Sequence, residues 1–409
     1  MHPRLLDPTA ETEAPAAHAR TLRAATRQRW PALLRAWPHL HGTDPRAPWD
    51  TLPLTTKADL RGGYPLGRLA VPRSALRRVH ASSGTSGIPT VVAYTEGDLS
   101  LWARVVARGL AAVGVEAGTV VHSTLGYGLF TGGLGFHAAA ERLGACVVPA
   151  AAGNGARHRR LLADLDAEVL LSTPSYAMHL AESADAPLPT VTAGVFGAEP
   201  MPDALRSRLE DAWGMRAHDT YGLSEAIGPG VAFECPARAG LHVNADVFHP
   251  EVIDPVAGTP LPEGAIGELV LSAPSKEAMP LLRYRTGDLT ALDHQPCACG
   301  RALPRLRGIR GRVDDMRVVR GVNVYPSQIE AALLRFRFLR TAWQATITRP
   351  ESLDRLVVVA ESDDTRPATQ RAVARGLADA LGLRVAVTLC PPGTLPPPAG
   401  KANRLVDQR

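Results

Sequence analysis

The chain has 409 residues, of which 45% are hydrophobic and 21% charged, a composition typical of a globular protein with two or three domains. Its formal net charge of +5 includes no run of five or six like charges, so neither nucleic acid nor a membrane is expected as a partner. The N-terminus lacks an apolar core, no stretch approaches 18 apolar residues, and the five cysteines follow no disulfide framework, so we expect a cytoplasmic protein.

The first half of the chain predicts helices followed by an alternation of strands and helices. Residues 20–37 carry apolar side chains at helical spacing. From about 69 to 270, short apolar runs alternate with helical stretches, and the expected strands are 119–125, 144–150, 167–173 and 193–199. This alternation is typical of a parallel sheet covered by helices.

The second half changes character twice. Between about 230 and 300 strand-like runs alternate with Gly/Pro turns, and after Gly311–Asp315 a helix, a strand and a second helix are expected at 326–336, 354–362 and 367–382. We therefore predict an α/β fold class with a large N-terminal domain at 1–311, containing parallel sheets and the β-rich subdomain, and a small α+β C-terminal domain at 316–409. Residues 312–315 join the two.

A polar loop, "SSGTSG" at residues 82–87, raises the first functional question. Hydroxyl groups and glycine-permitted backbone N–H groups can form a concave cradle for phosphate. The same composition also suits a solvated surface loop, and the loop is not a Walker A sequence, because G-x-x-x-x-G-K-[ST] is absent. The loop alone leaves both interpretations open.

Lysine usage provides a second clue. Only Lys57, Lys276 and Lys401 are lysines among the 45 basic residues, and the other 42 are arginines. Lysine carries a compact mobile charge, whereas arginine carries a planar fork. A lysine retained against such a bias is a candidate for a position where arginine cannot substitute.

Further motifs follow the loop in a fixed order: "FGAEPMP" (196–202), "DTYGLSEAIGPG" (219–230), "RYRTGDL" (283–289), "GRVDDMRVVRGVNVYPSQIE" (311–330) and "GKANRLVD" (400–407). This set resembles the adenylate-forming superfamily of acyl-CoA synthetases, adenylation domains and luciferases. Within it, "LPLTTKADLRGGYPLG" (52–67) and "GYGLFTGGLGFHAAAERLGA" (126–145) are most similar to the phenylacetate–CoA ligase group. The resemblance extends from about residue 50 to the C-terminus.

The resemblance implies that a carboxylate reacts with Mg·ATP to give an acyl-adenylate and pyrophosphate. Glu225 resembles the Mg²⁺ ligand, and one carboxylate together with phosphate oxygens is sufficient for this cation. The loop residues would hold the β- and γ-phosphates, Tyr221 would lie against adenine, and Asp288 and Arg312 would contact the ribose. The full set of implied ATP- and AMP-binding residues is Ser82, Ser83, Gly84, Thr85, Ser86, Gly87, Gly197, Ala198, Glu199, Pro200, Asp219, Thr220, Tyr221, Gly222, Asp288 and Arg312.

The same resemblance makes the C-terminal domain a mobile lid. Lys401 matches the catalytic lysine that reaches the substrate carboxylate and the α-phosphate, and Asp314 matches the hinge residue. Relatives usually carry a lysine at the position of Ile88 or Thr90, and its absence here predicts weaker ATP binding. Rotation of the lid implies a second step, the formation of a thioester with coenzyme A.

Aromatic and glycine residues predict the acyl pocket. Tyr127, Phe130, Gly132 and Phe196 suggest a flat, apolar slot for a small aromatic carboxylic acid. Aromatic residues in such runs also serve as ordinary core, which is the alternative for each of them.

Three cysteines and a histidine form a candidate structural zinc site. Cys235 and His242 are separated by six residues, and Cys297 and Cys299 follow about 55 residues later in the same strand-rich region. Two pairs of sulfur and nitrogen ligands suit a closed tetrahedral zinc site. The alternative is free cysteines beside a core histidine.

The expected function is an aryl-CoA ligase that uses ATP, Mg²⁺ and coenzyme A. Two alternatives remain: an adenylating enzyme that passes its acyl group to a carrier-protein thiol or an amine in a biosynthetic pathway, and a non-catalytic nucleotide-binding homologue. The resemblance also leaves a homodimer open.

Overall fold

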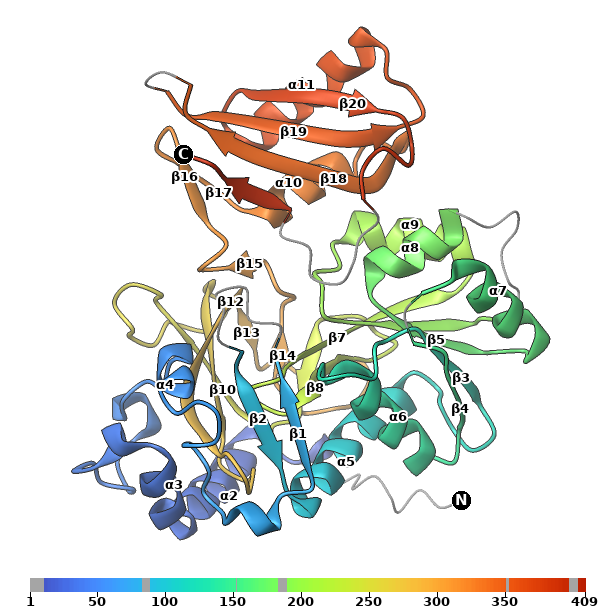
Figure 1. Cartoon of the computed structure of the whole chain (residues 1–409). Coiled ribbons are helices and arrows are strands. Elements are labelled where there is room, and N and C mark those ends of the chain that lie inside the picture. The colour runs from blue at the N-terminus through green and yellow to red at the C-terminus, as the bar shows by residue number, and fades with distance from the viewer. Residues whose placement is uncertain (1–10, 83–88, 152, 183–189, 351–352, 397–403) are drawn as a thin grey trace. The chain divides into compact units, whose positions relative to one another are not determined.

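The computed structural model describes residues 11–82, 89–151, 153–182, 190–350, 353–396 and 404–409 (Figure 1). The chain divides into two compact units. The first comprises Met1–Ser172, Leu188–Ala198 and Arg216–Ile309, and the second comprises Thr173–Pro187, Glu199–Met215 and Arg310–Arg409. The second unit includes two segments, Thr173–Pro187 and Glu199–Met215, that lie within the predicted N-terminal domain at 1–311. The predicted domain boundaries therefore remain a prediction. Among the described helices none is both long and apolar enough to cross a membrane.

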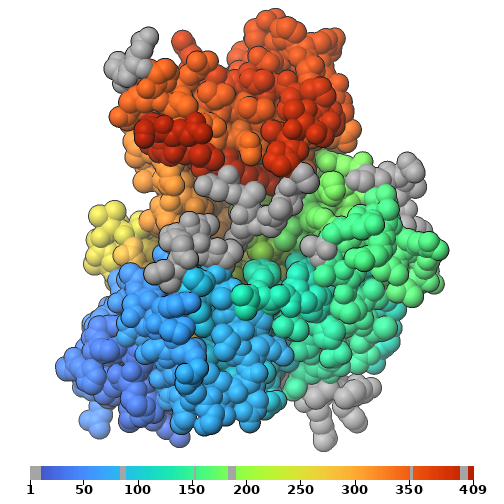
Figure 2. Space-filling view, viewed as in Figure 1, coloured from blue at the N-terminus to red at the C-terminus, as the bar shows by residue number. Residues whose placement is uncertain are grey.

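The N-terminal segment of the first unit is helical, as its periodicity predicts. It contains α2 (Pro15–Gln28), α3 (Trp30–Ala36), η2 (Pro38–Leu40), η3 (Trp49–Thr51), α4 (Lys57–Arg61) and η4 (Arg73–Ala75). Trp37 is fully buried, and its ring nitrogen donates a hydrogen bond of 2.6 Å to the carbonyl of Pro280. This contact fastens the segment, which forms a continuous blue area of surface in Figure 2, to the strand-rich part of the same unit.

A mixed sheet of nine strands is the centre of the first unit. Its order is β13-β14-β9-β8-β7-β6-β5-β3-β4. The parallel part consists of β3 (Val120–Ser123), β4 (Cys146–Pro149), β5 (Val169–Ser172), β6 (Ala193–Phe196) and β7 (Arg216–Leu223), and the antiparallel part of β8 (Gly228–Glu234), β9 (Leu241–Val243), β13 (Leu292–Asp293) and β14 (Arg305–Leu306).

All four predicted strands of the parallel part are confirmed. The helices of this unit that alternate with strands here are α5 (Glu96–Ala112), α6 (Gly132–Arg142) and α7 (Gly155–Asp164). After β7 the sheet becomes antiparallel, because a turn of four residues joins β7 to β8 and is too short for the crossover that a parallel pair needs. The short turn, with the sequence "SEAI" at residues 224–227, lies at this edge of the strands.

Two smaller sheets complete the first unit. The hairpin β1 (Arg78–Ala81) and β2 (Val91–Tyr94) flanks the polar loop, with Ala81 paired to Val91. The strands β10 (His249–Ile253), β11 (Gly267–Ala273) and β12 (Leu281–Thr290) are antiparallel neighbours, as the Gly/Pro-punctuated pattern of this β-rich region predicts.

The second unit contains the predicted C-terminal α+β domain. Its sheet has the order β20-β19-β18-β21 and a core shared with the helices α10 (Pro326–Leu333) and α11 (Pro367–Leu381). The strands are β18 (Leu339–Thr348), β19 (Arg355–Ser362), β20 (Val385–Cys390) and β21 (Leu405–Asp407), preceded by β15 (Gly311–Arg312) and the hairpin β16 (Arg317–Val319) and β17 (Val322–Val324). The helices α8 (Pro174–Glu182) and α9 (Asp203–Trp213) also belong to this unit, and Arg208 of α9 donates a 2.7 Å hydrogen bond to the carbonyl of Leu339.

Candidate active site and metal cluster

Two predicted nucleotide-binding residues meet at the end of β7. The hydroxyl of Tyr221 donates a hydrogen bond of 2.6 Å to the Asp288 carboxylate on β12, and both side chains are buried. An O–H donor at this distance from a carboxylate makes a strong, charge-assisted bond. The bond fixes the plane of the carboxylate that the resemblance assigns to the ribose.

Glu225, the predicted Mg²⁺ ligand, lies in the turn between β7 and β8 and is approached by two lysines. The ammonium of Lys57 is 3.5 Å from its carboxylate, and the ammonium of Lys276 donates a 3.2 Å hydrogen bond to its main-chain carbonyl. The Lys57 side chain is 40% exposed, whereas Lys276 is fully buried. Both lysines of the described chain therefore converge on a single glutamate.

Lys276 is held in an unusual setting for a charged side chain. Its ammonium lies 5.0 Å from the centre of the Tyr94 ring, and Asp98 accepts hydrogen bonds from the next two main-chain N–H groups, at Glu277 and Ala278. Burial lowers the pKa of Lys276 to about 8, although Asp98 and Glu225 act in the opposite direction. The turn that carries Glu225 is thus held by a buried ammonium, whose charge Asp98 and Glu225 partly stabilise.

Lys57 is placed by local capping and by pairing with β12. It is the first residue of α4, whose N-cap Thr56 forms a reciprocal capping box with Asp59. The preceding Thr55 exchanges main-chain hydrogen bonds of 2.9 Å with Arg283 and Arg285 of β12, the strand that carries Asp288. The same strand therefore positions both the Asp288 carboxylate and the start of the helix that bears Lys57.

The polar loop is closed at its base. The N–H of Ser82 donates to the carbonyl of Thr90 at 2.9 Å, and the Ser82 hydroxyl accepts from the N–H of Thr90 at 3.2 Å. Thr90 is buried, so position 90 faces the protein interior. The predicted phosphate-binding residues Ser83, Gly84, Thr85, Ser86 and Gly87 lie outside the described residues, as does Ile88.

Close backbone packing explains some of the glycines in the nucleotide motifs. A Cβ on Gly222 would lie 2.0 Å from the carbonyl oxygen of Gly228, where β7 and β8 approach most closely, so only glycine fits. Strands β6 and β7 pair in parallel with Phe196 opposite Asp219, which brings Gly197 beside Thr220. The structure thus joins the first half of "GAEP" to "DTYG".

The remaining predicted nucleotide residues belong to the second unit. Glu199 accepts hydrogen bonds from the N–H and hydroxyl of Ser175 at the start of α8, and burial raises its pKa. Arg312 forms a bidentate pair with Asp314, the predicted hinge residue, at 2.9 and 3.2 Å. Pro200 follows Glu199 directly. Lys401 lies outside the described residues, so its role stays a prediction.

The residues predicted for the acyl pocket differ in exposure. Tyr127 is half-buried and Phe130 is exposed, while Phe196 is fully buried in β6. The Phe130 ring lies directly over Gly132, where a Cβ would come within 2.5 Å of it. The assignment of these four residues to a pocket stays a prediction.

The three cysteines and the histidine come together at the edge of the large sheet. Cys235 follows β8, His242 lies on β9, and Cys297 and Cys299 lie between β13 and β14. The four ligand atoms lie within 4.8 Å of one another, and all but Cys299 are buried. Strand pairing of β9 with both β8 and β14 brings these distant segments to one place.

The distances fit a tetrahedral zinc ion. Zinc–sulfur bonds of about 2.3 Å put two sulfurs roughly 3.8 Å apart, and a sulfur and a nitrogen roughly 3.5 Å apart. The Sγ atoms of Cys235 and Cys297 are 3.8 Å apart, and Cys299 Sγ is 3.4 Å from His242 Nε2. The sulfurs are too far apart for a disulfide, whose S–S bond is about 2.05 Å. The cluster can therefore hold a metal ion.

Contacts around the cluster also suit a metal site. The Nδ1 atom of His242 lies 3.3 Å from the carbonyl of Leu303, an arrangement that directs Nε2 toward the sulfurs. Burial lowers the pKa of His242 to about 4, so its ring is neutral, as a ligand must be.

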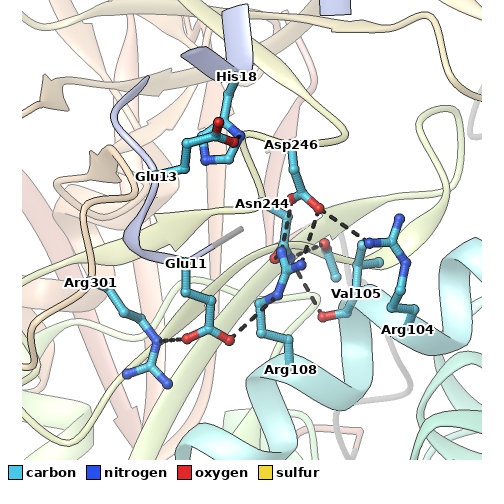
Figure 3. A network of polar contacts seen from close by, with 10 residues as sticks. Glu11, Glu13, His18, Arg104, Val105, Arg108, Asn244, Asp246 and Arg301 are labelled. Atoms are coloured by element: carbon cyan, nitrogen blue, oxygen red, sulfur yellow. Dashed lines mark hydrogen bonds and ion pairs between the residues drawn. The ribbon is translucent and has the colours of Figure 1, made fainter. Parts of the chain in front are cut away.

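The cluster is connected to a network of ion pairs shown in Figure 3. Arg301, two residues after Cys299, donates to the Glu11 carboxylate at 2.5 Å, and Glu11 in turn lies 3.5 Å from buried Arg108. Arg108 also pairs with Asp246 at 2.8 Å. The Cys/His cluster thus lies beside the contacts that hold the start of the described chain.

The sequence interpretation missed the roles of Lys57 and Lys276. Neither belongs to a nucleotide motif of the resemblance, yet both reach Glu225. The scarcity of lysine in the sequence was the signal that could have identified them.

The sequence families agree with this geometry. The model of the "AMP-binding enzyme" family matches residues 76–279, and that of the "AMP-binding enzyme C-terminal domain" matches residues 321–409. The fold and the site therefore define an adenylate-forming enzyme.

Curated relatives narrow the class. The chain is 45% identical over 385 residues to "Phenylacetate-coenzyme A ligase" of Thermus thermophilus, covering 88% of this chain and 86% of the relative. It is 43% identical to the ligase of the same name from Pseudomonas putida, covering 87% and 84%. The chain belongs to the phenylacetate–coenzyme A ligase family of AMP-forming acid–CoA ligases.

Solved structures share the fold. The 2-hydroxyisobutyryl-CoA ligase in its postadenylation state, in complex with 2-HIB-AMP, has a TM-score of 0.90 at 29% identity, covering 98% of this chain and 92% of that chain. The same ligase with 2-HIB-AMP and CoA in the thioesterification state has a TM-score of 0.72, covering 98% and 91%.

Proposed function

We propose that the protein activates a small aromatic carboxylic acid with Mg·ATP and transfers the acyl group to coenzyme A. Two contacts carry this proposal. The Tyr221 hydroxyl bonds to Asp288, the predicted ribose acceptor, and the Lys57 ammonium pairs with Glu225, the predicted cation ligand. Phenylacetate is the acid in the names of the curated relatives, which supports an aryl acid as the substrate.

In the first step a carboxylate oxygen of the acid attacks the α-phosphorus, the bond to the bridging oxygen breaks, and pyrophosphate leaves. Negative charge lies on both reactants, so the site must offset their repulsion and align them. Asp288 accepts the ribose hydroxyls while Tyr221 holds its carboxylate in plane. Glu225 would hold the Mg²⁺ ion, which would neutralise negative charge at the phosphates.

We propose that Lys57 supplies the ammonium that the polar loop lacks. In the structure it pairs with Glu225, and its exposed side chain leaves it able to turn toward a phosphate that arrives with Mg²⁺. A flexible point charge suits this task better than the planar fork of arginine. The lysine-free loop is then compensated by a lysine from α4.

Two residues of the C-terminal region, Lys401 and Asp314, have proposed roles in the same reaction. We assign to Lys401 the donor that stabilises charge at the α-phosphate, and to Asp314 the hinge of a mobile lid comprising residues 316–409. The pairing of Arg312 with Asp314 supports a hinge that moves together with a ribose-binding arginine. A location in the cytoplasm suits a reaction that consumes ATP and coenzyme A.

We further propose that Cys235, His242, Cys297 and Cys299 hold a structural zinc ion. The distances match a four-ligand site without an open position, which is typical of structural and not catalytic zinc.

Exchange of labelled pyrophosphate into ATP tests the first half-reaction. Exchange should require an aryl acid from a panel of benzoates, phenylacetates and anthranilates, and Lys401→Ala should lower its rate about 10²–10³-fold. If no acid in the panel supports exchange, the protein is a nucleotide-binding homologue without this activity. Supplying coenzyme A, a carrier protein or free amines then identifies the acceptor, and a thioester of coenzyme A is expected.

A further inference from the structure

A second hydrogen-bonded chain lies next to the residues proposed for the acyl pocket. The hydroxyl of Tyr127, in the loop after β3, is 3.3 Å from Nδ1 of His137, and Nε2 of His137 is 3.1 Å from the Glu141 carboxylate. His137 and Glu141 are one turn apart on α6, and the Tyr127 and His137 rings meet edge to face at 5.6 Å.

The order of donors in this chain follows from chemistry. An ionised carboxylate can only accept, so Nε2 of His137 carries the proton that points to Glu141. In the neutral ring Nδ1 is then an acceptor, and it must receive the hydroxyl proton of Tyr127. Tyr127 therefore donates its single proton to His137.

A second side chain acts on the Tyr127 hydroxyl, whose oxygen can also accept. Burial raises the pKa of Tyr127, and the side chain of Ser123, fully buried at the end of β3, opposes this rise by acting as a donor toward the hydroxyl. The contact with His137 therefore restrains the position of the Tyr127 hydroxyl, and a change of χ1 at Tyr127 would break it. Tight packing of the loop on α6 adds to this restraint, because a Cβ on Gly133 would lie 2.4 Å from the carbonyl of Gly126.

We propose that His137 and Glu141 are positioning residues that lock the Tyr127 ring as a specificity-determining wall of the acyl pocket, with its O–H donor directed away from the substrate. The inference rests on the proposed function, in which Tyr127 contacts the acyl group. In this arrangement the Tyr127 ring is fixed and its O–H is not available to the substrate. The pocket should therefore favour apolar aryl acids over acids whose ring carries hydrogen-bond acceptors. Glu141 is 63% exposed and His137 is partly buried, at 26%, and neither belongs to the buried core.

A double-mutant cycle tests the lock. His137→Leu and Tyr127→Phe should each raise the KM for phenylacetate about five- to twentyfold in pyrophosphate exchange, with kcat and the KM for ATP within twofold of the wild type. The double variant should be no worse than either single variant, since both remove the same hydrogen bond. His137→Asn keeps an acceptor near the position of Nδ1 and should restore a KM close to the wild-type value.

Arg160→Leu is the matched control, because Arg160 and Asp164 form a comparable pair one turn apart on α7, outside the site. It should change nothing. Equal effects of His137→Leu on the KM for ATP and for every acid, or multiplied effects in the double variant, would overturn the lock.

Nitrogen NMR of the histidine rings separates this inference from the proposed function. The signal missing in His137→Leu should report the Nε2–H form in the wild type, even if no aryl acid supports exchange. A Nδ1–H form would overturn the inference whatever the enzyme's activity.

Discussion

Replacing Lys57 by methionine should nearly abolish adenylation while leaving the fold intact. The ammonium of Lys57 is 3.5 Å from the Glu225 carboxylate. At this distance the Coulomb energy is about 5 kcal/mol for an effective dielectric constant of 20 and about 1 kcal/mol in water. Because the lysine is 40% exposed, the lower value applies, and measured exposed pairs contribute about 0.2–1 kcal/mol. Loss of a positioned donor at a reacting phosphate instead costs about 10²–10³ in rate.

The assay is pyrophosphate exchange at varied Mg·ATP, together with urea unfolding of each variant. Lys57→Met should lower exchange at least 10²-fold, raise the KM for ATP and leave the KM for the acid unchanged, with a loss of stability of at most about 1 kcal/mol. Lys57→Arg should recover only part of the rate, because the fork is longer and planar. Arg73→Met removes one exposed positive charge from the same segment and is the control. Exchange within threefold of wild type in Lys57→Met, or a loss of several kcal/mol in stability, would refute a phosphate-directed role.

Three further outcomes follow from the site. Tyr221→Phe removes the donor of a buried bond to a carboxylate, which contributes about 1.5–3 kcal/mol, so the KM for ATP should rise at least tenfold, and an unchanged KM would contradict the geometry. Cys299→Ser should lower the zinc content measured by mass spectrometry and the melting temperature together, whereas Cys146→Ser, outside the cluster, should alter neither. A strong chelator should reproduce the loss of stability in the wild type and not in the metal-free variant.

Local patterns were sufficient for the parallel strands. Runs such as "AEVLLST" combine β-propensity with a length that fits a buried strand, and β5 forms there with all four residues buried. The mixed nature of the large sheet was beyond these patterns, because the direction of β8 depends on the length of one turn. The hairpin β1–β2 was also missed, since its two strands of four residues flank a loop whose composition dominates the segment.

The sequence allowed the residues of the site to be predicted, but it did not allow the contacts between them to be predicted. Tyr221 and Asp288 are 67 positions apart, and only the resemblance grouped them. The metal cluster was different, because spacing and ligand chemistry alone suggested all four of its residues before the strands brought them together. The His137 and Glu141 contacts could not be inferred, since an (i, i+4) pair on a helix is ordinary and gives no sign that a tyrosine outside the helix is its third member.

The pattern of lysines has a physical explanation in the structure. The side chain of Lys276 is fully buried. Its ammonium lies 5.0 Å from the centre of the Tyr94 ring and donates one hydrogen bond to the carbonyl of Glu225. An arginine there would bring five N–H donors into a space that offers few acceptors, and each unsatisfied donor would carry a desolvation cost of about 1–3 kcal/mol. At position 57 the proposed role requires reach and mobility, since one ammonium would contact Glu225 before the nucleotide binds and a phosphate afterwards. Arginine is therefore unsuited to both positions, although for different reasons, and both lysines contact the same residue, Glu225.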